Sequence, residues 1–292
     1  MTRIIQSPLA NVLNIRVDAI DMERAVRKFC KILRDERKGY VCVAGVHGIM
    51  EAQRSRALAE VYAQADLTIP DGMPLVWVGH AQGYRDMQRV TGPDFMLRIF
   101  HQSEYSGTTH YLYGGEAGVA EQLREIMCRR FPGARIVGSR TPPFRDLNKS
   151  EERELIEEIR FLHPDVIWVG ISCPKQELFM YRYLPLLDTK VMVGVGAAFD
   201  YHTGRIRDSS EWVKRAGLQW LHRLIQDPKR LWKRHLRNNP VFLFQITRQL
   251  LLERLHEYPK EPAPELVTAD SELGFDDTSK PQEASGTRSA VA

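Results

Sequence analysis

The 292-residue sequence lacks the features of a membrane-spanning or exported chain. It has no uncharged apolar run of the ~20 residues that a helix needs to cross a bilayer, and its N-terminal segment has no apolar stretch like that of a signal peptide. Its four cysteines, at positions 30, 42, 128 and 173, show no paired metal-ligand spacing. We therefore expect reduced thiols in a cytoplasmic protein, for which any membrane contact is peripheral.

Several fixed binding signatures are also missing. No Asp-x-Asp pair, the usual metal clamp for a nucleotide diphosphate, occurs at a strand end, and there is no HxxxH, CxxC or P-loop pattern. The sequence thus offers no recognisable metal or cofactor site. If a diphosphate were a leaving group, its charge would have to be neutralised by Arg, Lys or backbone amides.

Charge is small in sum but uneven along the chain. The net charge is +4, which does not call for a nucleic-acid partner. Residues 205–254 hold nine Arg and three Lys against four acidic residues, a local net charge of +8, whereas residues 259–292 have a net charge of −4. The basic segment indicates an anionic partner. The acidic segment is rich in Pro, Ser and Glu and predicts a disordered tail.

Apolar runs alternate with helical patterns over residues 1–200, which favours a Rossmann-like parallel sheet flanked by helices in an α/β domain. The first strand is expected at residues 12–17. Beyond residue 200 the pattern becomes helical, with helices expected at 211–226, 228–237 and 240–257. The sequence predicts an α/β domain at 1–200, a basic helical appendage at 201–258 and a disordered acidic tail at 259–292.

Asp71 is the first candidate for chemistry. The short apolar run Leu67–Pro70 ends at Asp71-Gly72, and the carboxyl ends of strands are where open α/β sheets bind ligands. A carboxylate there can accept a proton from an attacking hydroxyl. The alternative is an ordinary Pro-Asp-Gly turn, which these three residues alone favour.

Three more motifs follow predicted strands. Gly114 and Gly115 open the segment GGEAG, whose amides could approach a diphosphate, although a tight strand-to-helix turn explains the glycines equally well. Gln176, in CPKQE, begins a helix and could bond phosphate or sugar hydroxyls. Asp200 follows a buried apolar run. For these two residues, a solvated helix start and a capping role are the commoner alternatives.

The appendage contributes Arg223 and Arg230, which lie within a few turns of Trp220 and Trp232. Basic amphipathic helices with Trp and Leu favour an anionic interface. The alternative is a charged solvent face over an ordinary apolar core stripe.

In this order, the motifs resemble those of the WecG/TagA/CpsF glycosyltransferases (glycosyltransferase family 26). The resemblance covers residues 41–244. The two matching stretches nearest the C-terminus are too long to agree by chance. The matching stretches are ADLTIPDGMPLVW, RVTGPDFM, YLYGGEAGVAEQL, FPGARIVGS, CPKQE, VGVGAAFDYHTGRIRDSSEWVKRAGLQWLHRLIQDP and KRLWKRHLRNNPVFL.

The resemblance implies an inverting enzyme without essential metal or cofactor. Such an enzyme moves an N-acetylmannosamine-type or glucose-type sugar from a UDP-sugar to a polyprenyl-diphosphate-linked acceptor. Such an enzyme acts in exopolysaccharide or cell-surface glycan synthesis. It works in the cytoplasm, peripherally bound to the anionic inner face of the cell membrane. No nucleic-acid partner is implied, and a homo-oligomer stays open.

The resemblance also assigns residues. Asp71 becomes the general base, and Gln176 and Asp200 line the site. Arg223 and Arg230 reach the diphosphate from an appendage that docks on the membrane. The turn at residues 114–115 is a candidate to hold part of either diphosphate.

One departure from the family pattern concerns residues 43–45. Relatives often read Thr-x-Asn here, whereas this chain has Val43-Ala44-Gly45. The missing hydroxyl and amide predict an altered substrate or reduced activity. They also motivate an alternative, a non-catalytic sugar-nucleotide or lipid-diphosphate binding subunit. A basic nucleic-acid binder rests only on the +8 segment and is disfavoured.

Overall fold

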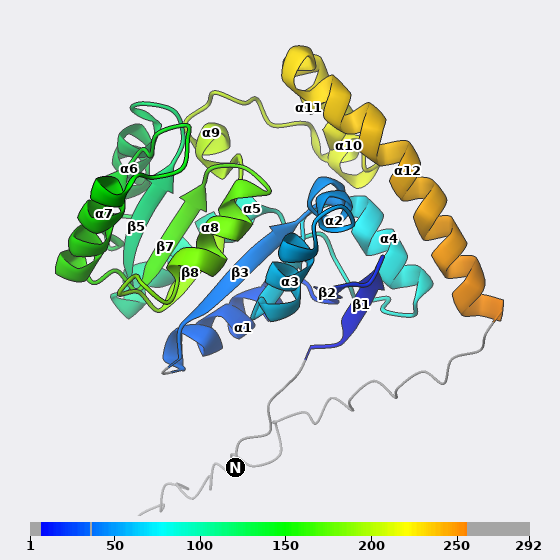
Figure 1. Cartoon of the computed structure of the whole chain (residues 1–292), viewed down its shortest axis with the longest axis horizontal. Coiled ribbons are helices and arrows are strands. Elements are labelled where there is room, and N and C mark those ends of the chain that lie inside the picture. The colour runs from blue at the N-terminus through cyan, green and yellow to red at the C-terminus, as the bar shows by residue number, and fades with distance from the viewer. Residues whose placement is uncertain (1–6, 36, 256–292) are drawn as a thin grey trace, which may run out of the picture. The chain divides into compact units, whose positions relative to one another are not determined.

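Six parallel strands form the central sheet of the computed structural model, which describes residues 7–35 and 37–255 (Figure 1). Their order across the sheet is β4-β3-β8-β7-β5-β6. The strands are β3 (Gly39–Ala44), β4 (Leu67–Pro70), β5 (Thr109–Gly114), β6 (Arg135–Arg140), β7 (Val166–Gly170) and β8 (Val191–Gly194). The predicted acidic tail at 259–292 lies outside the described residues.

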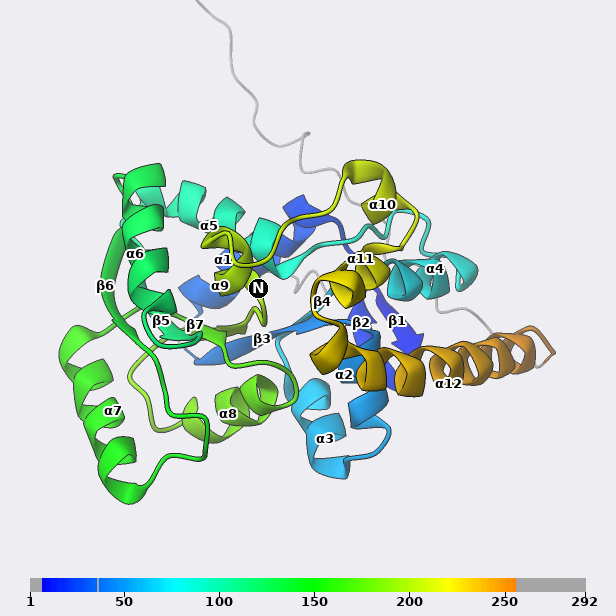
Figure 2. The ribbon, with the colours of Figure 1, turned by 90° about the horizontal axis from the view of Figure 1, so that it is seen from above.

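Helices cover both faces of the sheet, which explains why its strands are apolar on both sides (Figure 2). In β3, Tyr40 and Cys42 belong to one buried cluster and Val41 to the other. The helices with the first cluster are α2 (Val46–Ala52), α3 (Arg56–Gln64), α7 (Lys149–Leu162) and α8 (Lys175–Tyr183). Those with the second are α1 (Met22–Arg34), α5 (Gly92–Ser106), α6 (Val119–Arg130) and α9 (Ala198–His202). The predicted α/β class is confirmed.

The N-terminal segment is a hairpin, so the single strand predicted at 12–17 was wrong. Strands β1 (Leu9–Val12) and β2 (Ile15–Asp18) pair antiparallel. Leu13 and Asn14 form the turn between them with φ of 52° and 64°. Two-residue hairpin turns with positive φ match the twist of the strands that they join.

The C-terminal helices also differ from expectation. The helix predicted at 211–226 is two helices, α10 (Glu211–Arg215) and α11 (Gln219–Gln226), because Gly217 breaks it with φ of +70°. The break predicted before Pro240 is absent, since α12 (Pro228–Leu255) runs through this proline. A proline inside a helix removes one backbone hydrogen bond, and α12 tolerates that loss. The predicted domain boundary near residue 200 stays a prediction.

Helix α12 packs against α2, α11 and α4 (Met73–Ala81), and so joins the appendage to the sheet domain (Figure 1). Among the described helices, none is both long and apolar enough to cross a membrane.

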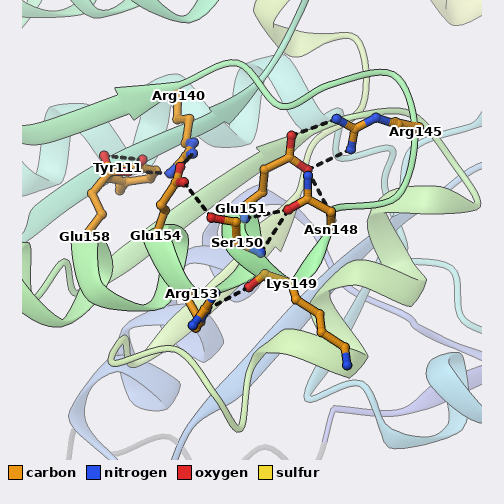
Figure 3. Close-up of polar contacts among 10 residues, drawn as sticks. All are labelled: Tyr111, Arg140, Arg145, Asn148, Lys149, Ser150, Glu151, Arg153, Glu154 and Glu158. Atoms are coloured by element: carbon orange, nitrogen blue, oxygen red, sulfur yellow. Dashed lines mark hydrogen bonds and ion pairs between the residues drawn. The ribbon is translucent and has the colours of Figure 1, made fainter.

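Helix α7 begins with a complete capping box (Figure 3). Asn148 accepts hydrogen bonds from the backbone amides of Ser150 and Glu151, and the Glu151 carboxylate accepts from the Asn148 amide. Further along α7, Glu158 accepts from Tyr111 of β5 and from Arg140 of β6. These contacts fix α7 to the outer strands, at the far end of the sheet from β4.

Candidate active site

A cavity of about 520 Å³ lies at the carboxyl ends of β3, β4 and β8. Gly45 and His47 line it after β3, Asp71 after β4 and Ala197 after β8. Side chains of α4, α11 and α12 close its other walls. The carboxyl edge of an open parallel sheet is the usual ligand site of such folds, and here the appendage completes that site.

Asp71 is fixed by backbone contacts on two sides. Its own amide donates to the carbonyl of Ala44 at 2.9 Å, which holds it at the end of β3, and the Gly92 amide hydrogen-bonds its carboxylate. The following residue, Gly72, is the N-cap of α4. Asp71 therefore lies at a strand end in the wall of the cavity, as its place in the sequence predicts.

The pKa of Asp71 is raised above its ordinary value. Loss of water on burial is the main cause, and the nearby Asp94 adds to it. Arg89 and Arg223 oppose the shift with their positive charges. With its pKa raised, the Asp71 carboxylate binds a proton more readily than an exposed aspartate.

Arg89 was not assigned a role from the sequence. It precedes Val90, whose amide donates to the carbonyl of Pro70 at 2.9 Å, so this segment runs along the end of β4. The only sequence feature that marked Arg89 was its position at the start of the stretch RVTGPDFM, which is part of the family resemblance. Arg223 reaches the same region from α11, with its guanidinium carbon 5.6 Å from the centre of the Tyr201 ring. Both arginines line the cavity.

Gly114 and Gly115 lie at the end of β5, outside the cavity lining. A Cβ at Gly114 would lie 2.5 Å from the carbonyl oxygen of Gly170, and the Gly115 amide donates to that oxygen at 3.0 Å. Both have positive φ. The close approach of β5 to β7 thus gives these glycines a packing reason, and their substrate contact stays a prediction.

Gln176 is buried, with 2% of its surface exposed. Its Oε1 accepts from the Gly196 amide and its Nε2 donates to Glu177, both at 2.9 Å. It thereby ties α8 to the loop after β8. Asp200 lies in α9 next to Tyr201, and neither Gln176 nor Asp200 lines the cavity. The side chain of Arg230 lies outside the described part of the chain. Substrate contact by these residues stays a prediction.

A hydrogen-bonded pair that the sequence gave no reason to expect joins α12 to α2. Asn238 is 2% exposed, and its Nδ2 donates to Nδ1 of His47 at 2.9 Å. Its Oδ1 accepts from Arg54 at 2.9 Å. Burial, and next the charge of Arg234, lower the pKa of His47 to about 4. His47 is thus neutral at physiological pH and can accept the bond from Asn238.

Within residues 7–35 and 37–255, no three His, Cys, Asp or Glu side chains are grouped so that they could hold a metal ion. The positive charge beside Asp71 comes from Arg89 and Arg223. What the described residues provide is a carboxylate, two guanidinium groups and an enclosed space at a sheet edge. This set can accept a proton and neutralise an anion.

Comparison with known proteins gives a consistent result. The sequence model of a family described as "Glycosyl transferase WecG/TagA/CpsF family" matches residues 10–256. The chain is similar to an N-acetylglucosaminyldiphosphoundecaprenol N-acetyl-beta-D-mannosaminyltransferase of Bacillus spizizenii, with 29% identity over 203 residues, 69% of this chain and 77% of that protein. It is also 26% identical to a Bacillus subtilis protein of the same name over 185 residues, 63% of this chain and 70% of the relative. The chain belongs to the WecG/TagA/CpsF family of glycosyltransferases.

Proposed function

We propose that this glycosyltransferase moves an N-acetylmannosamine-type or glucose-type sugar from a UDP-sugar to a polyprenyl-diphosphate-linked sugar. The product would be an intermediate of exopolysaccharide or another cell-surface glycan. The names of the two relatives, both N-acetylmannosaminyltransferases of an undecaprenol-linked acceptor, support this choice. The observation that carries it is the Asp71 carboxylate in the cavity wall, under the combined charge of Arg89 and Arg223.

In the proposed reaction, Asp71 takes the proton from the acceptor hydroxyl. The acceptor oxygen forms a bond to the anomeric carbon on the face opposite the diphosphate, so the configuration inverts. The bond from that carbon to the diphosphate oxygen breaks, and UDP leaves with the electron pair. General-base assistance of this kind is worth ~10²- to 10⁴-fold in rate.

The departing diphosphate requires positive charge, which is most effective when it is fixed in place before the reaction. Arg89 and Arg223 are the described residues best placed to supply it, since both act on Asp71 through their charge. Arg230 is a third candidate by its place in the family motif. We propose on this basis that transfer needs no divalent metal.

The remaining predicted residues share the sheet edge with Asp71. Gly114 ends β5 and Gly115 follows it, Gln176 follows β7 and Asp200 follows β8. We propose that the nucleotide end of the donor extends along this edge, with its sugar at the Asp71 end. The common edge supports the proposal, because parallel strands present all their carboxyl ends on one side.

The appendage is proposed to dock on the inner face of the membrane. Helices α10 to α12 expose large apolar side chains among basic ones, a composition that favours an anionic lipid interface. The exposed apolar residues include Trp212, Ile225, Trp232, Leu236, Phe244 and Leu255. Co-sedimentation with anionic but not neutral vesicles, lost at high salt, is the expected behaviour; equal binding to both would contradict it.

The direct test offers the purified chain a panel of UDP-sugars with an N-acetylglucosaminyl-diphosphate-polyprenyl acceptor. We expect UDP release and an extended lipid product with one donor of the N-acetylmannosamine or glucose type, in EDTA as well as in magnesium. Donor binding without product would instead favour the non-catalytic binding subunit. Activity that EDTA abolishes and magnesium or manganese restores would overturn the metal-independent leaving-group scheme.

A further inference from the structure

The cavity around Asp71 continues into an apolar groove between α4 and α12. Helix α4 starts directly after Asp71-Gly72, and its residues Pro74, Trp77 and Val78 line the cavity at successive turns. They lead away from the carboxylate along the helix. This wall is therefore apolar from its first turn onward.

Helix α12 forms the opposite wall and changes character along its length. Arg234, His235, Asn238 and Asn239 line the cavity, and apolar side chains follow at the three- and four-residue spacing of one helix face. These are Phe242, Leu243, Ile246 and Leu250. At 1.5 Å per residue, the stretch from 242 to 250 is about 12 Å long. The α12 wall is thus polar over residues 234–239, where Arg223 acts through its charge on both His235 and Asp71, and apolar beyond them.

The groove has a buried floor and exposed sides: Phe242 and Ile246 are each 5% exposed and belong to the apolar core. Leu243 is 66% exposed and Trp77 is 49% exposed, although both belong to the lining. Single exposed apolar residues are ordinary. An apolar stretch that continues the cavity of a catalytic carboxylate is instead typical of a ligand subsite.

We propose that the α4–α12 groove binds the first isoprene units of the acceptor's polyprenyl chain. The inference rests on the proposed function, in which only the acceptor has an apolar part. Its sugar hydroxyl must reach Asp71, and its diphosphate must lie close by in the polar part of the cavity, which Arg223 and Arg234 line. The polyprenyl chain then extends from the diphosphate into the part of the groove where the apolar lining begins. The enzyme would thus recognise the isoprene units nearest the diphosphate as well as the acceptor sugar.

The probes are isopentenyl, geranyl and farnesyl diphosphate, titrated calorimetrically into the full chain below their micellar concentrations. We expect affinity to rise about tenfold or more with each added unit, since hydrophobic pockets discriminate added carbons by at least this factor. Affinity that does not depend on chain length would overturn the proposal.

Neighbouring exposed residues on α12 provide a matched pair of variants. Leu243 lines the groove, whereas Phe244, 71% exposed, does not. Leu243→Gln should lose most of the gain from the second and third isoprene units, and Phe244→Gln should keep it. Thr247→Trp, at an exposed lining position, should block the groove without disturbing the core. Equal losses in L243Q and F244Q would show a general lipid-facing surface and refute a specific subsite.

A transfer assay separates this inference from the proposed function. The acceptor here is an N-acetylglucosaminyl diphosphate with a short water-soluble alkyl group. Transfer to it, combined with chain-length-independent binding of the prenyl diphosphates, would overturn the groove alone. Chain-length-dependent binding without transfer to any acceptor would overturn the proposed function and leave the groove standing.

Discussion

Docking of α12 should depend on Asn238, and replacing it by Ala tests how the appendage is held. The variant removes the hydrogen bonds to His47 and Arg54, each 2.9 Å long. A neutral hydrogen bond contributes about 0.5–1.5 kcal/mol and one to a charged group about 1.5–3 kcal/mol. The docking equilibrium should therefore weaken by about 2–4.5 kcal/mol, or roughly 30- to 1,600-fold at about 1.4 kcal/mol per factor of ten.

Hydrogen exchange of the α12 amides measures this change directly. Exchange should accelerate in N238A along α12, while amides of β7 and β8 in the sheet stay protected. Transfer should fall as well, because α11, which bears Arg223, packs on α12.

Asn239→Ala is the matched control, since the Asn239 side chain hydrogen-bonds His235 within α12 itself. This variant should leave α12 exchange close to wild type. Unchanged exchange in N238A, or equal acceleration in both variants, would refute the role assigned to Asn238.

Three further predictions concern the cavity. Burial lowers the pKa of His47 from 6.5 to about 4, so docking of α12 should be strongest above pH 6.5 and weaken as pH falls from 6.5 towards 4. Hydrogen exchange of the α12 amides as a function of pH would show this change. His47→Gln should flatten the pH dependence. Arg89→Gln removes a charge that lowers the pKa of Asp71, so the acidic limb of kcat/KM against pH should move to higher pH, and a limb that stays in place would contradict the assignment. Gly45→Ala should leave the Tm within about 1–2 °C because the added Cβ meets nothing within 4 Å, yet alter KM for one substrate because it narrows the cavity; a KM unchanged for both substrates would remove Gly45 from the site.

The sequence was sufficient for features that depend on local pattern. Alternating apolar runs and helices predict the parallel sheet, because a parallel strand needs a crossover before the next one. The position of Asp71 follows directly from this pattern, because a residue just after a buried strand lies at the carboxyl edge of the sheet. Gly72 then allows the chain to turn into α4. Arg223 could be placed by the family motif, and it lines the same cavity.

Features that depend on distant contacts were missed. Leu13 occupies a turn position with positive φ, which a leucine rarely adopts, so the local sequence gives no turn signal. Its amide is held by Gln249 of α12, 236 residues later in the chain. The bond between His47 and Asn238 spans 191 residues. No periodicity marks either partner of such contacts.

The C-terminal helices and the glycines show a related limit. Pro240 suggested a helix end, but α12 packs on α2 and α4, and that packing outweighs one lost hydrogen bond. From the sequence, Gly114 and Gly115 were equally compatible with a diphosphate-binding turn and with a tight strand-to-helix turn. Their spacing alone could not reveal that β7 approaches within contact of a Cβ at Gly114.

Asp71→Asn tests most directly whether Asp71 is the general base of glycosyl transfer. Because burial raises the pKa of Asp71, the neutral amide should fit the site without loss of stability, and donor affinity should be nearly unchanged. Turnover with the donor identified from the UDP-sugar panel should fall ~100-fold or more, which is the contribution expected of a general base. A D71N enzyme that folds, binds the donor and retains more than about a tenth of wild-type turnover would contradict the account.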